Sequence, residues 1–440
     1  MPDSELEITE SKLVLIAKHA AGKSNLQFTS LAHLLNFPFL RSCFYSLDRT
    51  KAAGVDGVRW EDYEVNLDEN LRSLLVRLKE KKYKPLPARR VYIDKSDGKK
   101  RPLGISALEN KIVEKGVTVI LQSIYEEDFS GQSFGFRPKR SCHMALRELN
   151  DRIYKNRTNY VVEADIKGFF DNVSHELLMD FIKVRIKDSS MLHLIGKFLK
   201  AGYIDNGIFN VSEVGTPQGS ILSPLLSNIF LHYVLDIWFE KVVKRHVHGY
   251  CEFIRYADDF VCVVKLENDA IRIEKALHNR FNRFGLELHT EKSRRISFGK
   301  LERGNAKAEN RRAHTFDFLG ITHYCDVSRR GYFKVGRVTS RKSFVSKCRE
   351  IKDWLKEKSS TSKPVKWWDD LKSKLRGHYQ YYGVSGNTRK VQEFYHCTQR
   401  ALFRRLNRRS QRKSYTWENF AEYLKKHPLP EPRLVHNFYQ

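Results

Sequence analysis

The chain has 440 residues and a mass of 51.7 kDa, too long for one ordinary core, so we expect two or three packed units. The hydrophobic fraction of 41% excludes general disorder, and the net charge of +27 indicates a polyanionic partner, nucleic acid before an acidic membrane surface. The seven cysteines are widely spaced without a C-x-x-C pair, which favours reduced cytoplasmic thiols over disulfides or structural zinc.

The first part of the chain, 1–85, is expected to be a mostly helical N-terminal extension. Its opening, MPDSELEITE, is acidic and lacks an apolar core, so we expect no signal peptide. No apolar run approaches the roughly 18 residues needed to cross a bilayer, so we expect a cytoplasmic protein with no membrane partner. Apolar residues at helical spacing predict helix over Leu6–Leu75, interrupted by a glycine-marked loop at Lys51–Val58.

A second unit, 86–330, begins with a basic hairpin. Ala88–Ile105 predicts two strands joined by a Ser-Asp-Gly turn, and the apolar stripe of Ala107–Tyr125 predicts a helix. Tyr160–Ile166 predicts a strand that leads into a helix. The candidate caps of that helix are Asp171, Asn172 and Ser174.

The rest of this unit alternates loops and strands. GTPQGS, from Gly215, is a Gly/Pro loop before a long apolar helix, and Phe253–Val264 predicts a hairpin with its turn at Ala257–Asp258. Lys300–Ala313 is expected to be a loop or insertion, and the following TFDFLGITHY predicts a strand.

The third unit, 331–440, is expected to be α-helical and basic. It holds 26 Lys and Arg against 9 Asp and Glu, a net charge of +17. Aromatic residues are interleaved with the cations, and the polar stretch Glu357–Pro364 is expected to break the helices.

The acids inside the hairpin FIRYADDFVCVV need a partner. Burying adjacent carboxylates is costly unless a cation neutralises them, and Asp258 and Asp259 lie within a strand-forming apolar run. Asp165 ends another such run. An oxygen-rich site of this kind suits Mg²⁺, and two such ions can activate a 3′-hydroxyl and stabilise the leaving pyrophosphate. The other Asp-Asp pair, Asp369–Asp370, has the polar helical context of a solvated surface and is assigned no catalytic role.

Motifs in one order along almost the whole chain now resemble a family. RYADDF is similar to the Y-x-D-D signature of reverse transcriptases, and EADIKGFFDNVSH to their first catalytic motif. AAGVDGV, RPLGI and SFGFRPKRSCHMAL resemble the N-terminal extension and fingers of group II intron-encoded and related non-LTR-type enzymes. GTPQGSILSPLLSNIFLHYVLD, FGLELHTEKS and FDFLGITHY resemble later palm motifs, and LRGHYQYYGV with LNRRSQRKSYTW resembles the maturase, or thumb, domain.

The resemblance implies an α+β right-hand polymerase with fingers, a palm built on an antiparallel catalytic sheet, and a helical thumb/maturase domain. It implies an RNA-directed DNA polymerase that is also a group II intron maturase. Its partners would be template and intron RNA, a DNA primer or target, and dNTPs. Nothing after YTWENF has the Cys/His spacing of the endonuclease of many relatives, so we expect a bacterial type that lacks this domain and takes its primer from elsewhere.

The catalytic residues follow from the same resemblance. Asp165, Asp258 and Asp259 match the metal-binding carboxylates, and Ile166 contributes a backbone carbonyl to the metal. Lys292 matches a lysine that protonates pyrophosphate.

Four residues match the dNTP site. Phe170 is the aromatic that packs against the sugar and excludes a 2′-hydroxyl, and Gln218 contacts the incoming nucleotide. Lys95 and Arg101 on the basic hairpin hold the triphosphate. Ser220 stands where the family more often has glycine, which tightens the pocket or changes fidelity without abolishing activity.

The expected RNA contacts lie near the end of the basic unit. They are Arg404, Arg405, Arg408, Arg409, Arg412 and Lys413. Such phosphate binding should weaken as salt rises.

Alternative functions remain at this point. One alternative is a host-adopted reverse transcriptase that acts in repair or defence. The DNA that flanks the reading frame distinguishes it from a mobile-intron protein, whereas the protein sequence barely does. An RNA-binding splicing cofactor with vestigial polymerase is disfavoured by the intact carboxylates, Phe170 and Gln218. RNA synthesis on an RNA template is disfavoured by Phe170.

Overall fold

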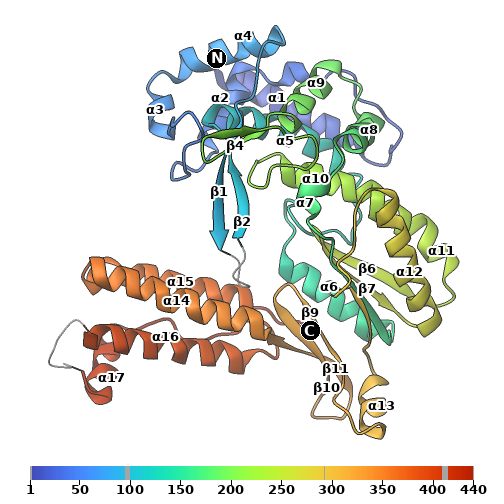
Figure 1. The fold of residues 1–440 in the computed structure, drawn as a ribbon, viewed down its shortest axis with the longest axis vertical. Helices are drawn as coiled ribbons and strands as arrows, with labels where there is room; N and C mark the ends of the chain where they lie inside the picture. The colour runs from blue at the N-terminus through green and yellow to red at the C-terminus, as the bar shows by residue number, and fades with distance from the viewer. Residues whose placement is uncertain (1, 95–99, 292, 409–414, 440) are drawn as a thin grey trace.

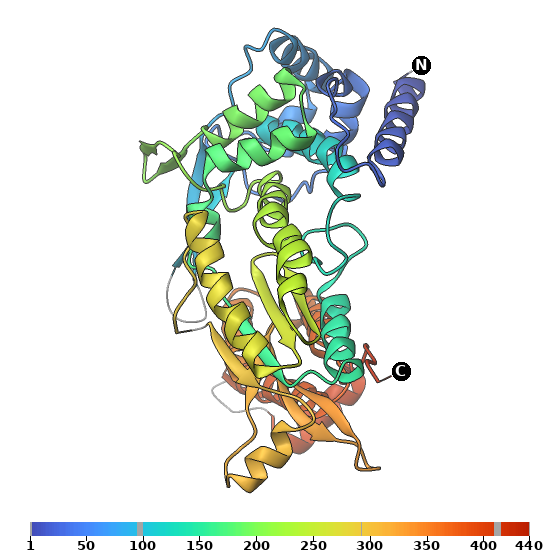
Figure 2. The same cartoon turned by 90° about the vertical axis from the view of Figure 1, so that its right-hand side faces the viewer.

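A computed structural model describes residues 2–94, 100–291, 293–408 and 415–439. The fold mixes helices and sheets and is α+β, as expected. The molecule is elongated, with helices of the N-terminal part at one end and helices of the C-terminal part near the other (Figure 1). A quarter turn shows the same long axis (Figure 2).

Helices form the N-terminal end, as the spacing of apolar residues predicts. They are α1 (Pro2–Ala20), α2 (Phe37–Tyr45), α3 (Trp60–Glu64) and α4 (Leu67–Lys79), with a short 3-10 turn at Ala32–Leu34. The Asn36 side chain caps α2 by accepting a hydrogen bond from Phe39 N at 3.0 Å. The interruption expected at Lys51–Val58 falls between α2 and α3.

A basic hairpin extends from this end toward the C-terminal helices (Figure 1). Its strands, β1 (Ala88–Asp94) and β2 (Lys100–Ile105), pair antiparallel as predicted. The expected Ser-Asp-Gly turn lies outside the described residues. The sheet is completed by β4 (Tyr203–Asp205), parallel to β1, and β5 (Ile208–Asn210).

The central sheet has the order β6-β7-β3-β8 and is antiparallel throughout. Its strands are β3 (Tyr160–Ala164), β6 (Cys251–Tyr256), β7 (Asp259–Val264) and β8 (Arg294–Ser297). The β6–β7 hairpin turns at Ala257–Asp258, as predicted.

Both faces of the central sheet are buried, because alternate side chains of a strand point to opposite faces. Val162, Phe260 and Cys262 belong to a core shared with the N-terminal helices. Val161 and Val263 belong to a second core shared with the C-terminal helices. The sheet therefore lies between two hydrophobic cores.

Further helices lie along this part of the chain, and α6 and α12 contact the central sheet. They are α5 (Leu108–Tyr125), α6 (Cys142–Lys155), α7 (Phe169–Asn172), α8 (His175–Arg185), α9 (Ser189–Leu199), α10 (Ser223–Leu231), α11 (Lys244–His246) and α12 (Glu267–Arg283), with π-helical turns at His232–Asp236 and Phe239–Val243. Of the candidate caps, Ser174 caps α8 by accepting from Leu177 N at 3.3 Å. Asp171 and Asn172 lie inside α7 and do not cap α8.

The C-terminal part holds a further sheet and the long helices. The sheet, β11-β10-β9, contains β9 (Thr315–Phe318), β10 (Ile321–Val327) and β11 (Phe333–Thr339). The helices are α14 (Arg341–Thr361), α15 (Trp368–Tyr382), α16 (Thr388–Arg408) and α17 (Trp417–Lys426).

Two expectations for this part were wrong in detail. Lys300–Ala313 contains a helix, α13 (Glu302–Ala308), anchored by the buried Glu302 carboxylate, which pairs with Arg311 and His314. The residues after 331 begin with strand β11 rather than a helix, since they pair with β10 along its length.

The polar stretch Glu357–Pro364 breaks the helices as expected, because α14 ends inside it at Thr361 and α15 begins only at Trp368. Its hydroxyls bond back to helix carbonyls, as in Ser360 Oγ to Glu357 O at 2.7 Å.

Within the described residues, no helix has the length and apolar character needed to span a membrane. All seven cysteines are free thiols.

Candidate functional site

The three predicted carboxylates lie at one end of the central sheet. β3 ends one residue before Asp165, and its last residue, Ala164, pairs with Phe260 of β7. This register places Asp165 opposite Asp259. Both residues line one cavity of about 460 Å³, and Asp258 lies in the adjoining hairpin turn. We call these three residues the carboxylate edge.

The pKa of the Asp258 carboxyl reflects the charged groups around the carboxylate edge. Burial raises the pKa of the Asp258 carboxyl, and the negative charge of Asp165 raises it further. The charges of Arg101, on β2, and Arg255, on β6, act in the opposite direction. The structure thus brings Arg101 of the basic hairpin within electrostatic reach of the carboxylate edge.

The donor chemistry of this edge fits a hard divalent cation. Carboxylate and carbonyl oxygens are what Mg²⁺ prefers, and it is usually bound by one or two carboxylates together with substrate phosphates. Among the described residues, no group of three or more His, Cys, Asp or Glu is arranged so that it could hold a metal ion.

Ile166 and its neighbours are fixed by a bridge to the segment before Lys292. Lys167 N donates to Glu287 O at 2.8 Å, and His289 N donates to Asp165 O at 2.7 Å. These bonds bracket Ile166, so its own carbonyl takes no part in them. Lys292 lies outside the described residues.

The turn that carries Asp258 has a strained backbone. Ala257 has a φ of 59°, in the left-handed region that side-chain-bearing residues rarely adopt. A Cβ on Gly135 would lie 2.3 Å from Ala257 N, so a glycine is required for this close approach. The surrounding structure must therefore hold the turn in place.

A buried arginine supplies that support. Arg255 is fully buried and donates to Ala257 O at 3.0 Å and to Asn228 Oδ1 at 2.9 Å. It also makes a two-pronged ion pair with Asp236, at 2.9 and 2.6 Å. Asn228 Nδ2 donates in turn to Gly135 O at 2.8 Å. The network joins α10 and the π-helical turn to the β6–β7 hairpin.

Phe170 and Gln218 meet in a second cavity, of about 570 Å³. Thr216 N donates to Phe170 O at 2.7 Å, which ties the Gly/Pro loop to α7. Gly104 N donates to Gln218 O at 2.6 Å, which ties the same loop to β2. A Cβ at Gly219, whose φ is 113°, would lie 2.5 Å from Gly104 O, so this contact also needs a glycine.

Ser220 has a buried partner. Glu114 on α5 is 3% exposed and accepts from Ile221 N at 2.8 Å and from Ser106 Oγ at 3.0 Å. The Ser220 hydroxyl also bonds to this carboxyl. Burial raises the pKa of Glu114, and these hydrogen bonds lower it in part. The residue that departs from the family pattern is thus joined to a carboxylate beneath the loop.

The predicted residues are therefore grouped, but not into one cavity. The cavity of Asp165 and Asp259 shares no lining residue with that of Phe170 and Gln218. Lys95 lies outside the described residues.

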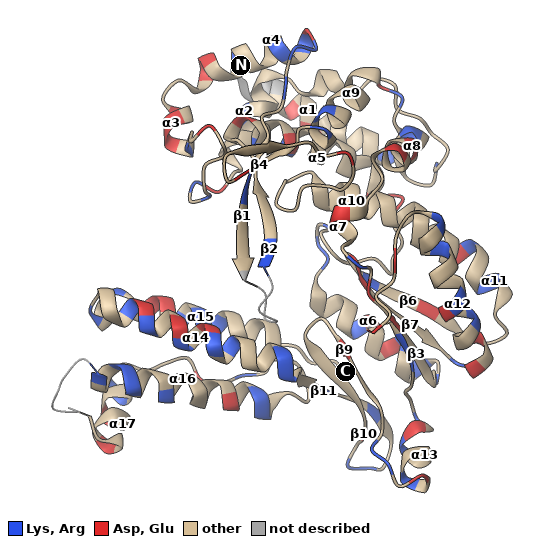
Figure 3. Cartoon of the chain, in the orientation of Figure 1, with Lys and Arg blue, Asp and Glu red and all other residues tan. Residues whose placement is uncertain are grey.

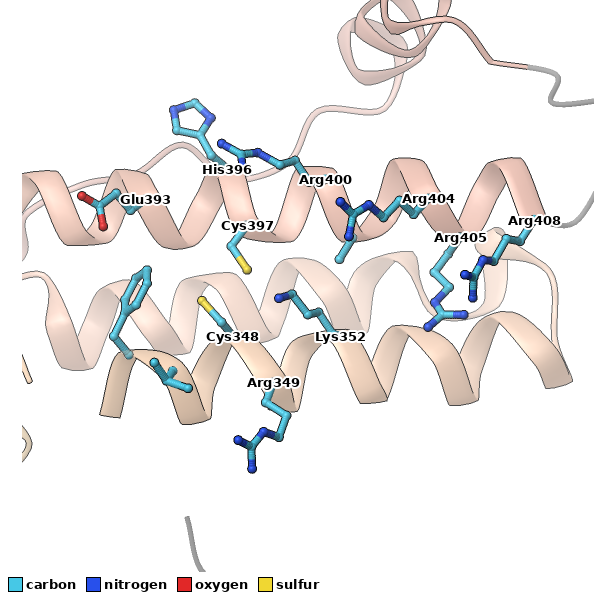
Figure 4. Close-up of a pocket in the computed structure, with 13 residues that line it drawn as sticks. Cys348, Arg349, Lys352, Glu393, His396, Cys397, Arg400, Arg404, Arg405 and Arg408 are labelled. Carbon is cyan, nitrogen blue, oxygen red and sulfur yellow. The ribbon is translucent and has the colours of Figure 1, made fainter. Parts of the chain in front are cut away.

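The predicted RNA contacts lie in the C-terminal helices, where basic residues are frequent (Figure 3). Arg404, Arg405 and Arg408 line a cavity of about 740 Å³ between α14 and α16, which we call the basic groove. Figure 4 shows their guanidinium groups beside Arg400 and Lys352. Arg409, Arg412 and Lys413 lie outside the described residues.

Sequence reasoning missed Arg255, Asp236 and Glu114. The sequence pattern contained a signal for two of these residues. Arg255 is a cation within an apolar strand, and Glu114 interrupts the apolar stripe of α5. A charge at a core position indicates a buried partner.

Comparisons with known proteins agree with the motif order. Residues 93–323 match the family model described as reverse transcriptase (RNA-dependent DNA polymerase). The chain is 39% identical over 255 residues to protein YkfC of Escherichia coli (strain K12), an alignment that covers 50% of this chain and 66% of YkfC.

Two intron proteins are also similar. The group II intron-encoded protein LtrA of Lactococcus lactis subsp. cremoris is 42% identical over 226 residues, which cover 51% of this chain and 37% of LtrA. An uncharacterized 91 kDa protein in the cob intron of Schizosaccharomyces pombe is 42% identical over 169 residues, 38% of this chain and 21% of that protein. The chain thus spans only part of the length of these relatives.

Proposed function

This chain belongs to the reverse transcriptase (RNA-dependent DNA polymerase) family, and on that premise we propose that it is an RNA-directed DNA polymerase that also acts as a group II intron maturase. The observation that carries the proposal is the convergence of Asp165, Asp258 and Asp259 at one end of the central sheet. The similarity to LtrA and to a protein encoded in a cob intron supports the maturase role.

The proposed layout follows the family. Residues 1–85 form the N-terminal extension, 86–330 the fingers and palm, and 331–440 the thumb/maturase domain. The basic hairpin belongs to the fingers and the central sheet to the palm. Their proximity is supported by the effect of Arg101 on Asp258.

Asp165, Asp258 and Asp259 would hold Mg²⁺ at the carboxylate edge, with the Ile166 carbonyl as a further oxygen. The metal would supply activation of the primer 3′-hydroxyl and charge stabilisation of the leaving pyrophosphate. Arg101 and Lys95 neutralise the triphosphate of the incoming nucleotide. Lys292 donates a proton to the pyrophosphate.

Selection of the nucleotide is assigned to the second cavity. The Phe170 ring occupies the space that a ribose 2′-hydroxyl needs, and Gln218 contacts the nucleotide. The backbone bonds to Phe170 O and from Gly104 N hold the loop that carries Gln218. The basic groove, with Arg404, Arg405 and Arg408, binds RNA phosphates.

Primer extension tests the proposal. The purified protein is given an RNA template, an annealed DNA primer, dNTPs and Mg²⁺ across a salt series. We expect DNA synthesis by the wild type and none by the double variant Asp258→Ala plus Asp259→Ala. The matched control is Asp369→Ala plus Asp370→Ala, which removes the other Asp-Asp pair, on α15.

The outcomes separate the candidate functions. Equal loss in both double variants would contradict a specific role of the carboxylate edge. No synthesis by the wild type at any salt, with RNA binding intact, would favour the splicing cofactor over the polymerase.

A further inference from the structure

Two cysteines line the basic groove. Cys348 comes from α14 and Cys397 from α16, and these helices pack against each other. Figure 4 shows their sulfur atoms pointing toward one another, with the Lys352 side chain alongside. Nothing in the proposed polymerase or RNA-binding roles uses a thiol.

Cations surround one of the two sulfurs. The interaction between the two thiols lowers the pKa of Cys397 and raises that of Cys348. Lys352 on α14 and Arg400 and Arg404 on α16 lower the pKa of Cys397 further. These cations therefore favour the thiolate of Cys397.

The other charged or titratable groups that line the groove are Arg349 on α14 and Glu393, His396, Arg405 and Arg408 on α16. Glu393 is paired with Arg389 and Lys390. The field at Cys397 is therefore set by its cationic neighbours.

The remaining cysteines have the opposite environment. Burial raises the pKa of Cys43 and Cys251 to about 12 and that of Cys325 to about 11. Cys262 is fully buried, with its pKa well above normal. Cys142 is partly exposed like Cys397, but burial raises its pKa too. Cys397 is thus the accessible nucleophile of the seven.

We propose that Cys397 and Cys348 are an oxidisable dithiol, a modification site at which a small-molecule disulfide creates a disulfide bond between α14 and α16. Cys397 is the attacking residue and Cys348 the resolving residue. This arrangement, an accessible thiolate beside a second cysteine, is the one that redox-sensitive sites share. The chemistry stands apart from the proposed polymerase. Only its consequence for RNA binding rests on the proposed function.

The reaction proceeds in two exchanges. The Cys397 thiolate attacks one sulfur of the small disulfide RSSR, a bond forms between the two sulfurs, and RS⁻ leaves with the electron pair of the broken bond. The released RS⁻ then takes the proton of the Cys348 thiol.

The Cys348 thiolate next attacks Cys397 Sγ and expels the second RS⁻, which takes a proton from water. The two cysteines lose two electrons in total, and RSSR is reduced to two RSH.

Native alkylation tests the first step. The full-length protein is treated with limiting iodoacetamide at pH 6.5, and each cysteine is quantified by peptide mass spectrometry. We expect Cys397 to react about tenfold faster than Cys142, because its larger thiolate fraction outweighs the lower nucleophilicity of a low-pKa thiolate. Equal or slower reaction at Cys397 would overturn the proposal.

Two substitutions at Cys348 separate its roles. Cys348→Ser keeps a hydroxyl donor, so fast alkylation of Cys397 should persist while disulfide formation is lost. Cys348→Ala removes the donor and should slow alkylation. The matched control is Cys142→Ser, which changes a partly exposed cysteine elsewhere. No difference among these variants would contradict the assigned pair.

Oxidised glutathione tests the second step. The wild type should lose about 2 Da on conversion of the dithiol to a disulfide, mapped to a Cys348–Cys397 peptide pair. Cys348→Ser should instead retain one glutathione on Cys397. A mixed disulfide that persists in the wild type would overturn the resolving role.

RNA protection links the site to the groove. Under conditions where RNA binds, RNA should slow alkylation of Cys397 and leave Cys142 unchanged. Fast alkylation without protection would support the modification site and contradict the RNA-binding role of the groove. Slow alkylation without RNA would overturn the modification site whatever the polymerase assay gives.

Discussion

The carboxylate edge collects negatively charged side chains and the basic groove positively charged ones. The two sets of side chains are held in place in different ways. The edge is held by a buried network in which Arg255 joins a strained turn to Asp236 and Asn228. The groove is lined by side chains of α14 and α16 that reach its open space from the helix surfaces (Figure 4). A reacting atom needs fixed geometry, whereas phosphate binding along a backbone tolerates flexible cations. The two supports match these two demands.

The largest effect is expected from breaking the network under the edge. Arg255→Met leaves the Asp236 carboxylate buried without its ion pair, which should cost about 3–5 kcal/mol of stability. Chemical denaturation measures this. The matched control is Arg294→Met, which removes a more exposed ion pair with Glu163 in the same sheet and should cost under about 1 kcal/mol. Similar losses in both variants would contradict the special role of the buried pair.

The next effect concerns the cavity beside the edge. Phe170→Ala opens the space assigned to the sugar, so the preference for dNTPs over rNTPs should fall roughly 10- to 100-fold. Steady-state incorporation of each nucleotide gives the ratio of kcat/KM. The control is Phe181→Ala on α8, an aromatic that stacks on Tyr233 instead of lining this cavity. An unchanged ratio would remove Phe170 from nucleotide selection.

RNA binding at the basic groove should weaken in proportion to the number of arginines removed. Arg404→Ala plus Arg408→Ala should weaken RNA binding about equally for all sequences. The slope of log affinity against log salt should become shallower by roughly 0.7–0.9 for each arginine that contacts a phosphate. Filter binding across a salt series measures it. Arg272→Ala plus Lys275→Ala on α12 removes two exposed cations and should leave the slope unchanged. Equal slopes in both double variants would contradict RNA contact at the groove.

A smaller effect is expected from the carboxyl beneath the nucleotide loop. Ser220→Gly removes one hydrogen bond to Glu114, worth about 1 kcal/mol, and should change the KM for dNTPs more than kcat. The same substitution in a Glu114→Gln background should have a smaller effect. Strictly additive effects in a double-mutant cycle would contradict the coupling.

Glu114 also predicts a pH dependence. Its folded-state pKa is raised, so its contribution to stability is fully present below the unfolded pKa and is lost as pH rises through the folded value. The stability of Glu114→Gln relative to the wild type should therefore increase as pH rises. Urea denaturation of both proteins over the same pH series isolates this residue. A constant difference between the two proteins would contradict it.

The sequence predicted elements with strong local patterns. The strand-forming apolar residues of Phe253–Val264 predicted both the hairpin and its turn, and the order of motifs predicted the family. Local pattern failed where a distant partner decides the structure. β11 forms a strand because β10 pairs with it, and α13 is anchored by an ion pair from Arg311 to the buried Glu302.

The same distinction applies to the candidate site. The carboxylates could be predicted from the sequence, because acidic residues in an apolar run need a cation. The buried network that holds them could not be predicted, since Arg255 contacts Asp236 only when the helices have packed on the central sheet. The predicted roles of the individual site residues await the experiments above.

The position of the central sheet between two cores has a consequence for biosynthesis. One core includes the N-terminal helices and α12, and the other includes α6 together with α15, α16 and Phe438. The second core therefore joins residues from widely separated parts of the chain. During translation this core stays incomplete until nearly the whole chain has been made.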